Sequence, residues 1–168
     1  MLTGLLLATL VVQKADEYGQ CIRWDPPVTA AAVEAAAKSP RAQYELGCLF
    51  RDNKAWAKAL KGVESGCSEW LITARQLKGF TDGGAAEELS ISLSVALTRA
   101  PAKVLDTVGY DETVCGNFEG AQTRQEAVGL LDAQEQAVKA VGAPRLAAAR
   151  RACLVGIQNA RALVPKGP

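Results

Sequence analysis

The side chains in this sequence that could do chemistry are mainly carboxylates and cysteines, because the chain contains no histidine. Histidine is the usual general base near neutral pH and the commonest metal ligand. Its absence excludes Ser-His-Asp and Cys-His nucleophiles and the zinc and iron sites that use imidazole. The sequence also lacks an S-x-x-K dyad, a GxGxxG loop and a phosphate-binding P-loop. We therefore predict no metal and no cofactor.

Five carboxylates are candidates for acid–base work, namely Glu87, Glu88, Asp111, Glu112 and Glu119. Two carboxyl groups suffice for glycoside hydrolysis, as in lysozymes. In the more ordinary interpretation, the first two lie in the early turns of a helix, where the dipole favours acids, and the others lie in an exposed loop. We favour that interpretation and predict no catalytic residues. The alternative is a carboxylate-based hydrolase that acts on a cell-wall glycan.

Five cysteines are scattered along the chain, at Cys21, Cys48, Cys67, Cys115 and Cys153. None forms a C-x-x-C pair, which excludes zinc ribbons and thioredoxin-like centres. In an oxidising compartment four of them would form two disulfides; in the cytosol they would be buried thiols. Spacing does not determine the pairing. Our hypothesis joins Cys115 to Cys153, a loop to the last helix, and Cys48 to Cys67, two neighbouring helices.

The amino-terminal twelve residues, MLTGLLLATLVV, form an apolar run that is too short to span a bilayer, which takes about 20 residues. The run is typical of the apolar region of a secretory signal, but no basic residue precedes it and no good cleavage site follows it. Residues 1–20 are therefore either a signal segment or an amino-terminal arm. We favour a periplasmic or secreted protein; the alternative is a cytoplasmic helical protein with free thiols.

Composition predicts one helical domain over residues 21–164, followed by a short tail at 165–168. The chain of 168 residues is 49% hydrophobic and only 5% aromatic, and alanine, the best helix former, is abundant. Its 19 basic and 18 acidic residues give a net charge of +1. That balance provides neither the basic face that binds nucleic acid nor a polybasic signal for anionic membranes.

Capping residues and prolines divide this domain into a series of helices. Each expected helix begins at a residue that can satisfy, or does not need, the first backbone N–H groups. These starts are at Thr29, Ser39, Asn53, Ser68, Asp82, Pro101, Thr123 and Pro144. Because the connections are short, we expect an all-α domain of stacked antiparallel helical hairpins.

Residues 88–97 are the one ambiguous segment. Leu89-Ser90-Ile91-Ser92-Leu93-Ser94-Val95 alternates with period two, which is typical of a strand. The same segment also carries leucines and alanines at helical spacing, behind a good cap at Asp82. No other segment offers a strand partner, and a lone strand is not stable. We therefore predict a helix.

Two features could recognise a partner. Trp24 lies in an extended, proline-flanked segment and could be an exposed anchor, or it could pack this arm onto the domain. The loop 109–120 is polar and acidic, with Asp111, Glu112 and Asn117, and loops on rigid scaffolds often carry recognition. In the alternative it is a plain connector. The leading functional prediction is a module that binds another protein.

The sequence resembles small secreted helical proteins found in bacterial genomes. The resemblance is carried by Trp56…Leu60…Gly66…Trp70-Leu71, then Asp82-Gly83…Glu87…Leu89, Ala96-Leu97…Pro101…Val104-Leu105 and Cys115, and by Arg150-Arg151-Ala152-Cys153-Leu154. These are core and capping positions. The resemblance implies a helical, exported protein with a Cys115–Cys153 bridge, and it implies no catalytic residue.

Overall fold

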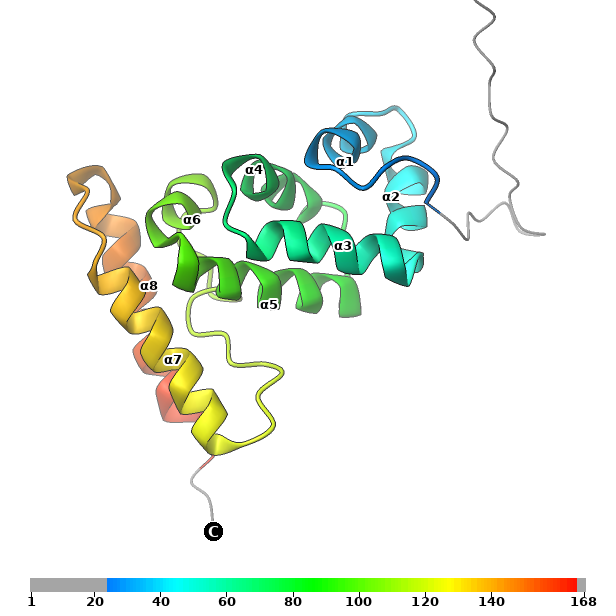
Figure 1. Cartoon of the computed structure of the whole chain (residues 1–168). Coiled ribbons are helices and arrows are strands. Elements are labelled where there is room, and N and C mark those ends of the chain that lie inside the picture. Colours follow the sequence, from blue (N-terminus) through cyan, green and yellow to red (C-terminus); the bar gives the residue numbers. More distant parts are fainter. Residues whose placement is uncertain (1–23, 166–168) are drawn as a thin grey trace, which may run out of the picture.

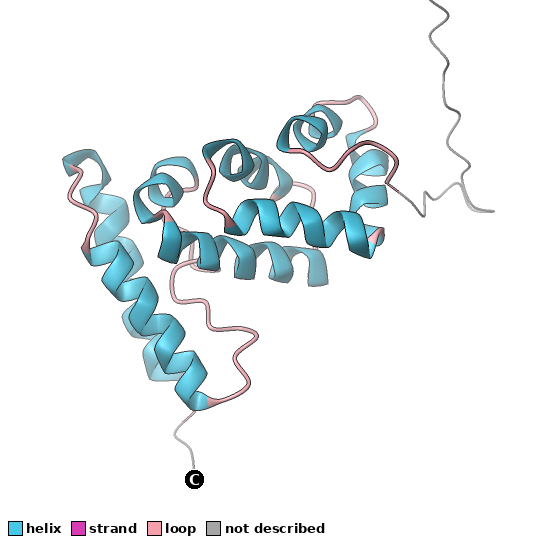
Figure 2. Cartoon of the chain, viewed as in Figure 1, coloured by secondary structure: helices cyan, strands magenta, loops and turns pink. Residues whose placement is uncertain are grey.

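The computed structural model describes residues 24–165, and over that range the chain is helical with no strand (Figures 1 and 2). The all-α prediction is confirmed. The elements are α1 Ala30–Ala37, α2 Ala42–Arg51, α3 Asn53–Glu64, α4 Ser68–Leu77, α5 Gly83–Arg99, α6 Pro101–Thr107, α7 Arg124–Lys139, a 3₁₀ turn Pro144–Leu146 and α8 Ala147–Leu163. The expected signal segment, Cys21 and residues 166–168 lie outside the described residues.

Helix α5 is the centre of the domain. It packs against α3, α6 and α7, while α4 packs against both α1 and α6. In Figure 1, α1, α4 and α6 form a row above α3 and α5, and the α7–α8 hairpin stands across one end of both rows. Between residues 24 and 165 no helix combines the length and the apolar character that crossing a membrane requires.

The ambiguous segment is helical because α5 has neighbours on several sides. Leu89, Leu93 and Leu97 are fully buried, yet three serines are buried as well, at Ser90, Ser92 and Ser94. The Ser94 hydroxyl donates to the carbonyl of Ile91, and the Ser90 hydroxyl donates to Thr113. Serine is small enough for close helix packing and can bond within its own helix. The period-two pattern therefore reflects a helix enclosed by others.

Side-chain caps form at the starts of α1, α3 and α7, whereas Asp82 precedes α5 without a capping bond, and two other predicted starts are corrected. Thr123 and Glu126 form the predicted capping box, and Thr29 caps α1. The cap of α3 is Asp52 and not Asn53, since the Asp52 carboxylate accepts from the N–H groups of Lys54 and Ala55. Helix α2 begins at Ala42 and not after Ser39, whose hydroxyl accepts from the Arg41 N–H and donates to Glu45.

Trp24 is not an exposed anchor, because only 7% of it is accessible to solvent. Its backbone N–H donates to Asp52 Oδ2 over 3.2 Å, and its ring belongs to the apolar core. Asp52 therefore caps α3 and fixes the amino-terminal arm at the same time. The alternative interpretation, that Trp24 packs the arm onto the domain, holds.

Ion pairs connect the two helices of the α7–α8 hairpin. The Arg161 guanidinium donates to Asp132 over 2.6 Å and to Glu135 over 2.8 Å. The bond to Asp132 raises the pKa of Arg161, and the bonds of Glu135 to Lys139 and then Arg161 lower the pKa of that carboxyl. Both groups are partly exposed, so this network contributes modestly to stability and weakens with salt.

Two helical glycines give a test of this packing. A Cβ at Gly62 in α3 would overlap the indole ring of Trp70, whereas a Cβ at Gly129 in α7 would meet nothing within 4 Å. We expect Gly62→Ala to lower the free energy of unfolding by about 2 kcal/mol. Gly129→Ala should raise it by about 0.5–1 kcal/mol, because alanine loses less backbone entropy in a helix. Urea unfolding of both variants measures this, and equal effects would contradict the packing of Trp70 on α3.

Candidate functional site: a tethered loop and its pocket

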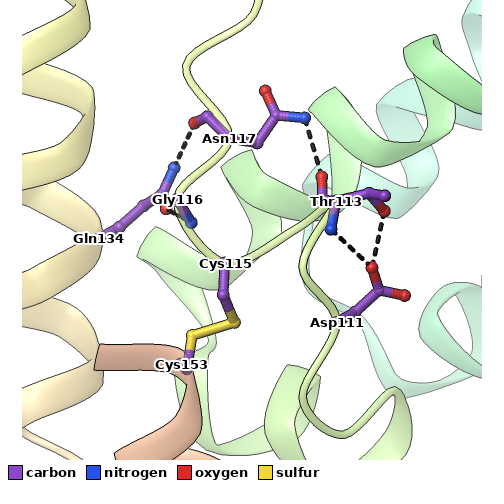
Figure 3. The surroundings of a disulfide bond; sticks show 7 residues. All are labelled: Asp111, Thr113, Cys115, Gly116, Asn117, Gln134 and Cys153. Atoms are coloured by element: carbon purple, nitrogen blue, oxygen red, sulfur yellow. Dashed lines mark hydrogen bonds between the residues drawn. A yellow bond between two sulfur atoms is a disulfide. The ribbon is translucent and has the colours of Figure 1, made fainter. Parts of the chain in front are cut away.

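The connection from α6 to α7 is a loop without regular structure, and a disulfide ties it to α8. Cys115 and Cys153 are bonded, with their Cα atoms 5.1 Å apart (Figure 3). This confirms the predicted pairing. Both cysteines are buried, at 3% and 0% exposure, so the bond lies under the loop and not on the surface.

A buried glutamine of α7 holds the same part of the loop by its backbone. Gln134 is 1% exposed; its Oε1 accepts from the N–H of Gly116 over 2.9 Å and its Nε2 donates to the carbonyl of Asn117 over 2.7 Å (Figure 3). Sequence reasoning missed this residue. The available signal was its position between Leu131 and Val138, on the apolar stripe of the helix, where a polar side chain needs a partner.

Asn117, predicted as a binding residue, orders the loop from within. Its Nδ2 donates to the carbonyl of Thr113 over 2.8 Å, and its Oδ1 accepts from the N–H of Glu119 over 2.9 Å. The side chain is 9% exposed. Asn117 thus faces the backbone of its own loop, and the loop keeps its shape because of these bonds.

Asp111 fastens the beginning of the loop to α4 and α5. Its Oδ1 accepts from the backbone N–H and the hydroxyl of Thr113, over 2.9 and 2.6 Å, and its other oxygen pairs with Lys78. Ser90 of α5 donates to the Thr113 hydroxyl over 3.1 Å. Burial lowers the pKa of Lys78, whose ammonium is the ion-pair partner of Asp111.

Small residues let the loop lie directly on α8. Gly116 has φ +93°, and a Cβ there would come within 2.8 Å of the Ala160 methyl group and the Gly156 carbonyl oxygen. A Cβ at Gly156 would in turn come within 3.0 Å of the Cys115 carbonyl oxygen and 3.4 Å of the Tyr110 ring. Glycine is therefore required on both sides of this contact.

Beside the loop lies an open pocket of about 660 Å³. Its walls are the beginning of α5, the loop and the carboxyl-terminal half of α8. Three of the five candidate acids line it, Glu87, Glu112 and Glu119, and among residues 24–165 no lysine or arginine does. Two exposed apolar side chains are also part of the lining: Tyr110, 46% exposed, and Leu163, 74% exposed.

The other two candidate acids do not line the pocket and are bonded to other side chains. Glu88 accepts from the Trp56 indole N–H over 2.6 Å, and Asp111 pairs with Lys78. The sequence thus identified the loop and three of the pocket's acids but could not show that α5 and α8 complete the pocket. Within residues 24–165 no three Cys, Asp or Glu side chains are placed to hold a metal ion.

The predicted Cys48–Cys67 disulfide is wrong. Cys67 is a free, exposed thiol at the amino-terminal cap of α4. Cys48 is 1% exposed on the inner face of α2. It is disulfide-bonded, but not to Cys67 and not to either member of the Cys115–Cys153 pair. Closeness in the chain suggested the wrong partner, because α2 packs mainly on α1 and α3.

Replacing Gln134 tests whether its two bonds hold the loop. Gln134→Leu leaves the Gly116 N–H and the Asn117 carbonyl without partners, and we expect the free energy of unfolding to fall by about 3 kcal/mol. The matched control is Gln136→Leu, at an exposed position of the same helix, which should stay within about 0.5 kcal/mol. Amide hydrogen exchange at Gly116 should quicken only in the first variant. Equal stability of the two would refute this role.

Removing the loop disulfide gives a second test. The bond links cysteines 38 residues apart, so Cys115→Ala with Cys153→Ala should lower the free energy of unfolding by about 4 kcal/mol. Cys67→Ala should change it little, since that thiol is free and exposed. Peptide mapping of unreduced protein should find Cys115 linked to Cys153 and Cys67 alkylated. Full alkylation of Cys115 or Cys153 before reduction would contradict the structure.

Comparison of the chain with protein-family models, curated proteins and solved structures finds no match. What the chain does must therefore be argued from the chemistry of its own loop and pockets.

Proposed function

We propose that the chain is an exported, non-enzymatic helical protein that binds another protein through its loop face. The loop face is the surface formed by Tyr110, Glu112, Glu119, Glu87 and Leu163 around the 660 Å³ pocket. The observation that carries this proposal is that the loop is fastened to α4, α5, α7 and α8, yet turns several side chains to solvent. A loop ordered in advance loses little entropy on binding.

Charge indicates the kind of partner. Of the residues that the structure describes, three glutamates and no basic residue line the pocket, so the complementary surface carries lysine or arginine. The exposed ring of Tyr110 can stack against a cation, and Leu163 offers apolar contact beside it. A basic segment with an apolar side chain next to its charge fits this combination.

The cysteines support export. The Cys115–Cys153 bond and the bonded state of Cys48 suit an oxidising compartment, in which disulfides persist. We therefore place the protein in the periplasm or outside the cell. The alternative, a cytoplasmic protein with free thiols, predicts that all five cysteines react with an alkylating agent without reduction.

A second candidate function is a carboxylate-based hydrolase of a cell-wall glycan. The observation in its favour is that Glu87, Glu112 and Glu119 share one pocket, whose volume lies in the range of about 300–1,000 Å³ typical of ligand sites. Such an enzyme needs one carboxyl as acid and a second as base or nucleophile, about 5–10 Å apart.

Photo-crosslinking in the native host tests the binding proposal. With benzoylphenylalanine at position 110 or at position 163, we expect one and the same protein adduct. The same label at Lys54, exposed at the beginning of α3, should give none. Reversing the charge with Glu112→Lys and Glu119→Lys should abolish the adduct, because a basic partner is then repelled. An adduct that survives charge reversal, or that forms equally from Lys54, would argue against the loop face.

An assay of the reducing ends released from purified peptidoglycan distinguishes the hydrolase alternative from the binding proposal. Activity that is lost in Glu87→Gln, Glu112→Gln or Glu119→Gln but retained in Glu69→Gln, outside the pocket, would replace the binding proposal. Absence of release by the folded, disulfide-bonded protein would exclude this glycan as a substrate.

A further inference from the structure

Tyr110 presents an exposed aromatic ring that is held against α8. The residue is 46% exposed and lines the pocket of the loop face. A Cβ on Gly156 would lie 3.4 Å from Tyr110 Cε2 and 3.5 Å from its hydroxyl oxygen, so one edge of the ring rests on that glycine. A tyrosine that is exposed and supported by a helix in this way is a common anchor for a partner.

Glu119, near the other end of the loop, is positioned by the buried Asn117. Its backbone N–H donates to Asn117 Oδ1 over 2.9 Å, and its Oε2 accepts a longer bond from Asn117 Nδ2, over 3.4 Å. Glu119 itself is exposed and lines the same pocket as Tyr110. Because an amide is uncharged, Asn117 holds this carboxylate in place and leaves its negative charge available.

No described lysine or arginine balances the charge of the pocket. Glu87 of α5 and Glu112 of the loop are exposed and line it, whereas no basic residue between positions 24 and 165 does. Lys78 is bonded to this loop but is already paired with Asp111, which is not part of the lining. The pocket therefore favours a cation, and it offers that cation an aromatic ring as well as carboxylates.

An arginine side chain suits this combination better than a lysine side chain does. The guanidinium is planar, so one face can stack on an aromatic ring while the N–H groups along its edge donate to carboxylates beside the ring. A lysine ammonium is a compact, strongly hydrated charge without a flat face, and it gains less from the ring. The two positioned groups, Tyr110 and Glu119, together favour arginine.

We propose that the loop face recognises an arginine side chain, presented by the partner. The guanidinium stacks on Tyr110 and donates to Glu119 and Glu112. The alkyl stem of the arginine lies against Leu163, which is 74% exposed in the same pocket. This inference rests on the binding function proposed above and adds the residue that the partner must carry.

Titration of the oxidised protein with N-acetylarginine methylamide tests the proposal, with backbone amide signals in proton–nitrogen NMR spectra as the readout. We expect saturable shifts at Glu112 and Glu119, with a Kd of about 1 mM for so small a ligand. N-acetyllysine methylamide carries the same charge and should bind about fivefold more weakly. N-acetylcitrulline methylamide has nearly the same shape as the arginine amide without its charge, and it should cause no saturable shift.

Two variants separate the ring from the carboxylate. Tyr110→Leu should bring the Kd of the arginine amide to that of the lysine amide, because the stacking surface is lost. Glu119→Gln should raise both values by about fivefold, since it removes one charge and keeps the shape of the side chain. Glu69→Gln, at an exposed position of α4 outside this pocket, is the matched control and should leave both values unchanged.

Absence of a saturable shift with the arginine amide would overturn the proposal, and so would equally tight binding of the lysine amide or the citrulline amide. A preference for arginine that persists in Tyr110→Leu would also count against it.

The crosslinking experiment described above keeps this inference and the binding proposal distinguishable. An adduct from position 110 or 163 without binding of the arginine amide would retain the loop face as a binding surface and exclude arginine as its ligand. Binding of the arginine amide without any adduct would support the guanidinium site and rule out a protein partner.

Discussion

A loop laid against three helices brings backbone N–H and carbonyl groups out of water, and each must find a partner there. This constraint governs the carboxyl-terminal half of the molecule. From α7, Gln134 accepts from the N–H of Gly116 and donates to the carbonyl of Asn117. Within the loop, the Asn117 side chain donates to the carbonyl of Thr113 and accepts from the N–H of Glu119. The Cys115–Cys153 bond removes the unfolded states in which these groups could separate.

The same fastening makes the loop face suitable for recognition. The bonds that order the loop are made by its buried groups, Asn117 and the backbone of Gly116, while Glu112 and Tyr110 stay exposed. Stability and binding thus draw on different residues of one segment. Changes to the exposed residues can alter the partner without loosening the loop, which is how recognition loops on rigid scaffolds are organised.

The sequence predicted the elements well and the contacts between them poorly, for physical reasons. Caps and prolines act locally, so the helix starts were close, with errors of one to three residues at α2, α3 and α8. The loop was found by its polarity, and Cys115–Cys153 was paired correctly. The pairing of Cys48 and the burial of Trp24 depend on which helix faces surround them, and no local rule supplies that. Gln134 was missed because a glutamine in a helix is usually exposed.

The abundance of small residues, which first indicated helices, also determines how closely the elements approach one another. Where backbone meets backbone, as at Gly116 against Gly156 and Ala160, a small side chain allows contact that any larger one would prevent. Where a small side chain lies between elements, as at Ala35 on α1, it lines a pocket of about 450 Å³ in the described part of the chain. Whether a small side chain gives a close contact or a gap depends on which residue faces it. The loop lies directly on α8 because the residues on both sides of that contact are small.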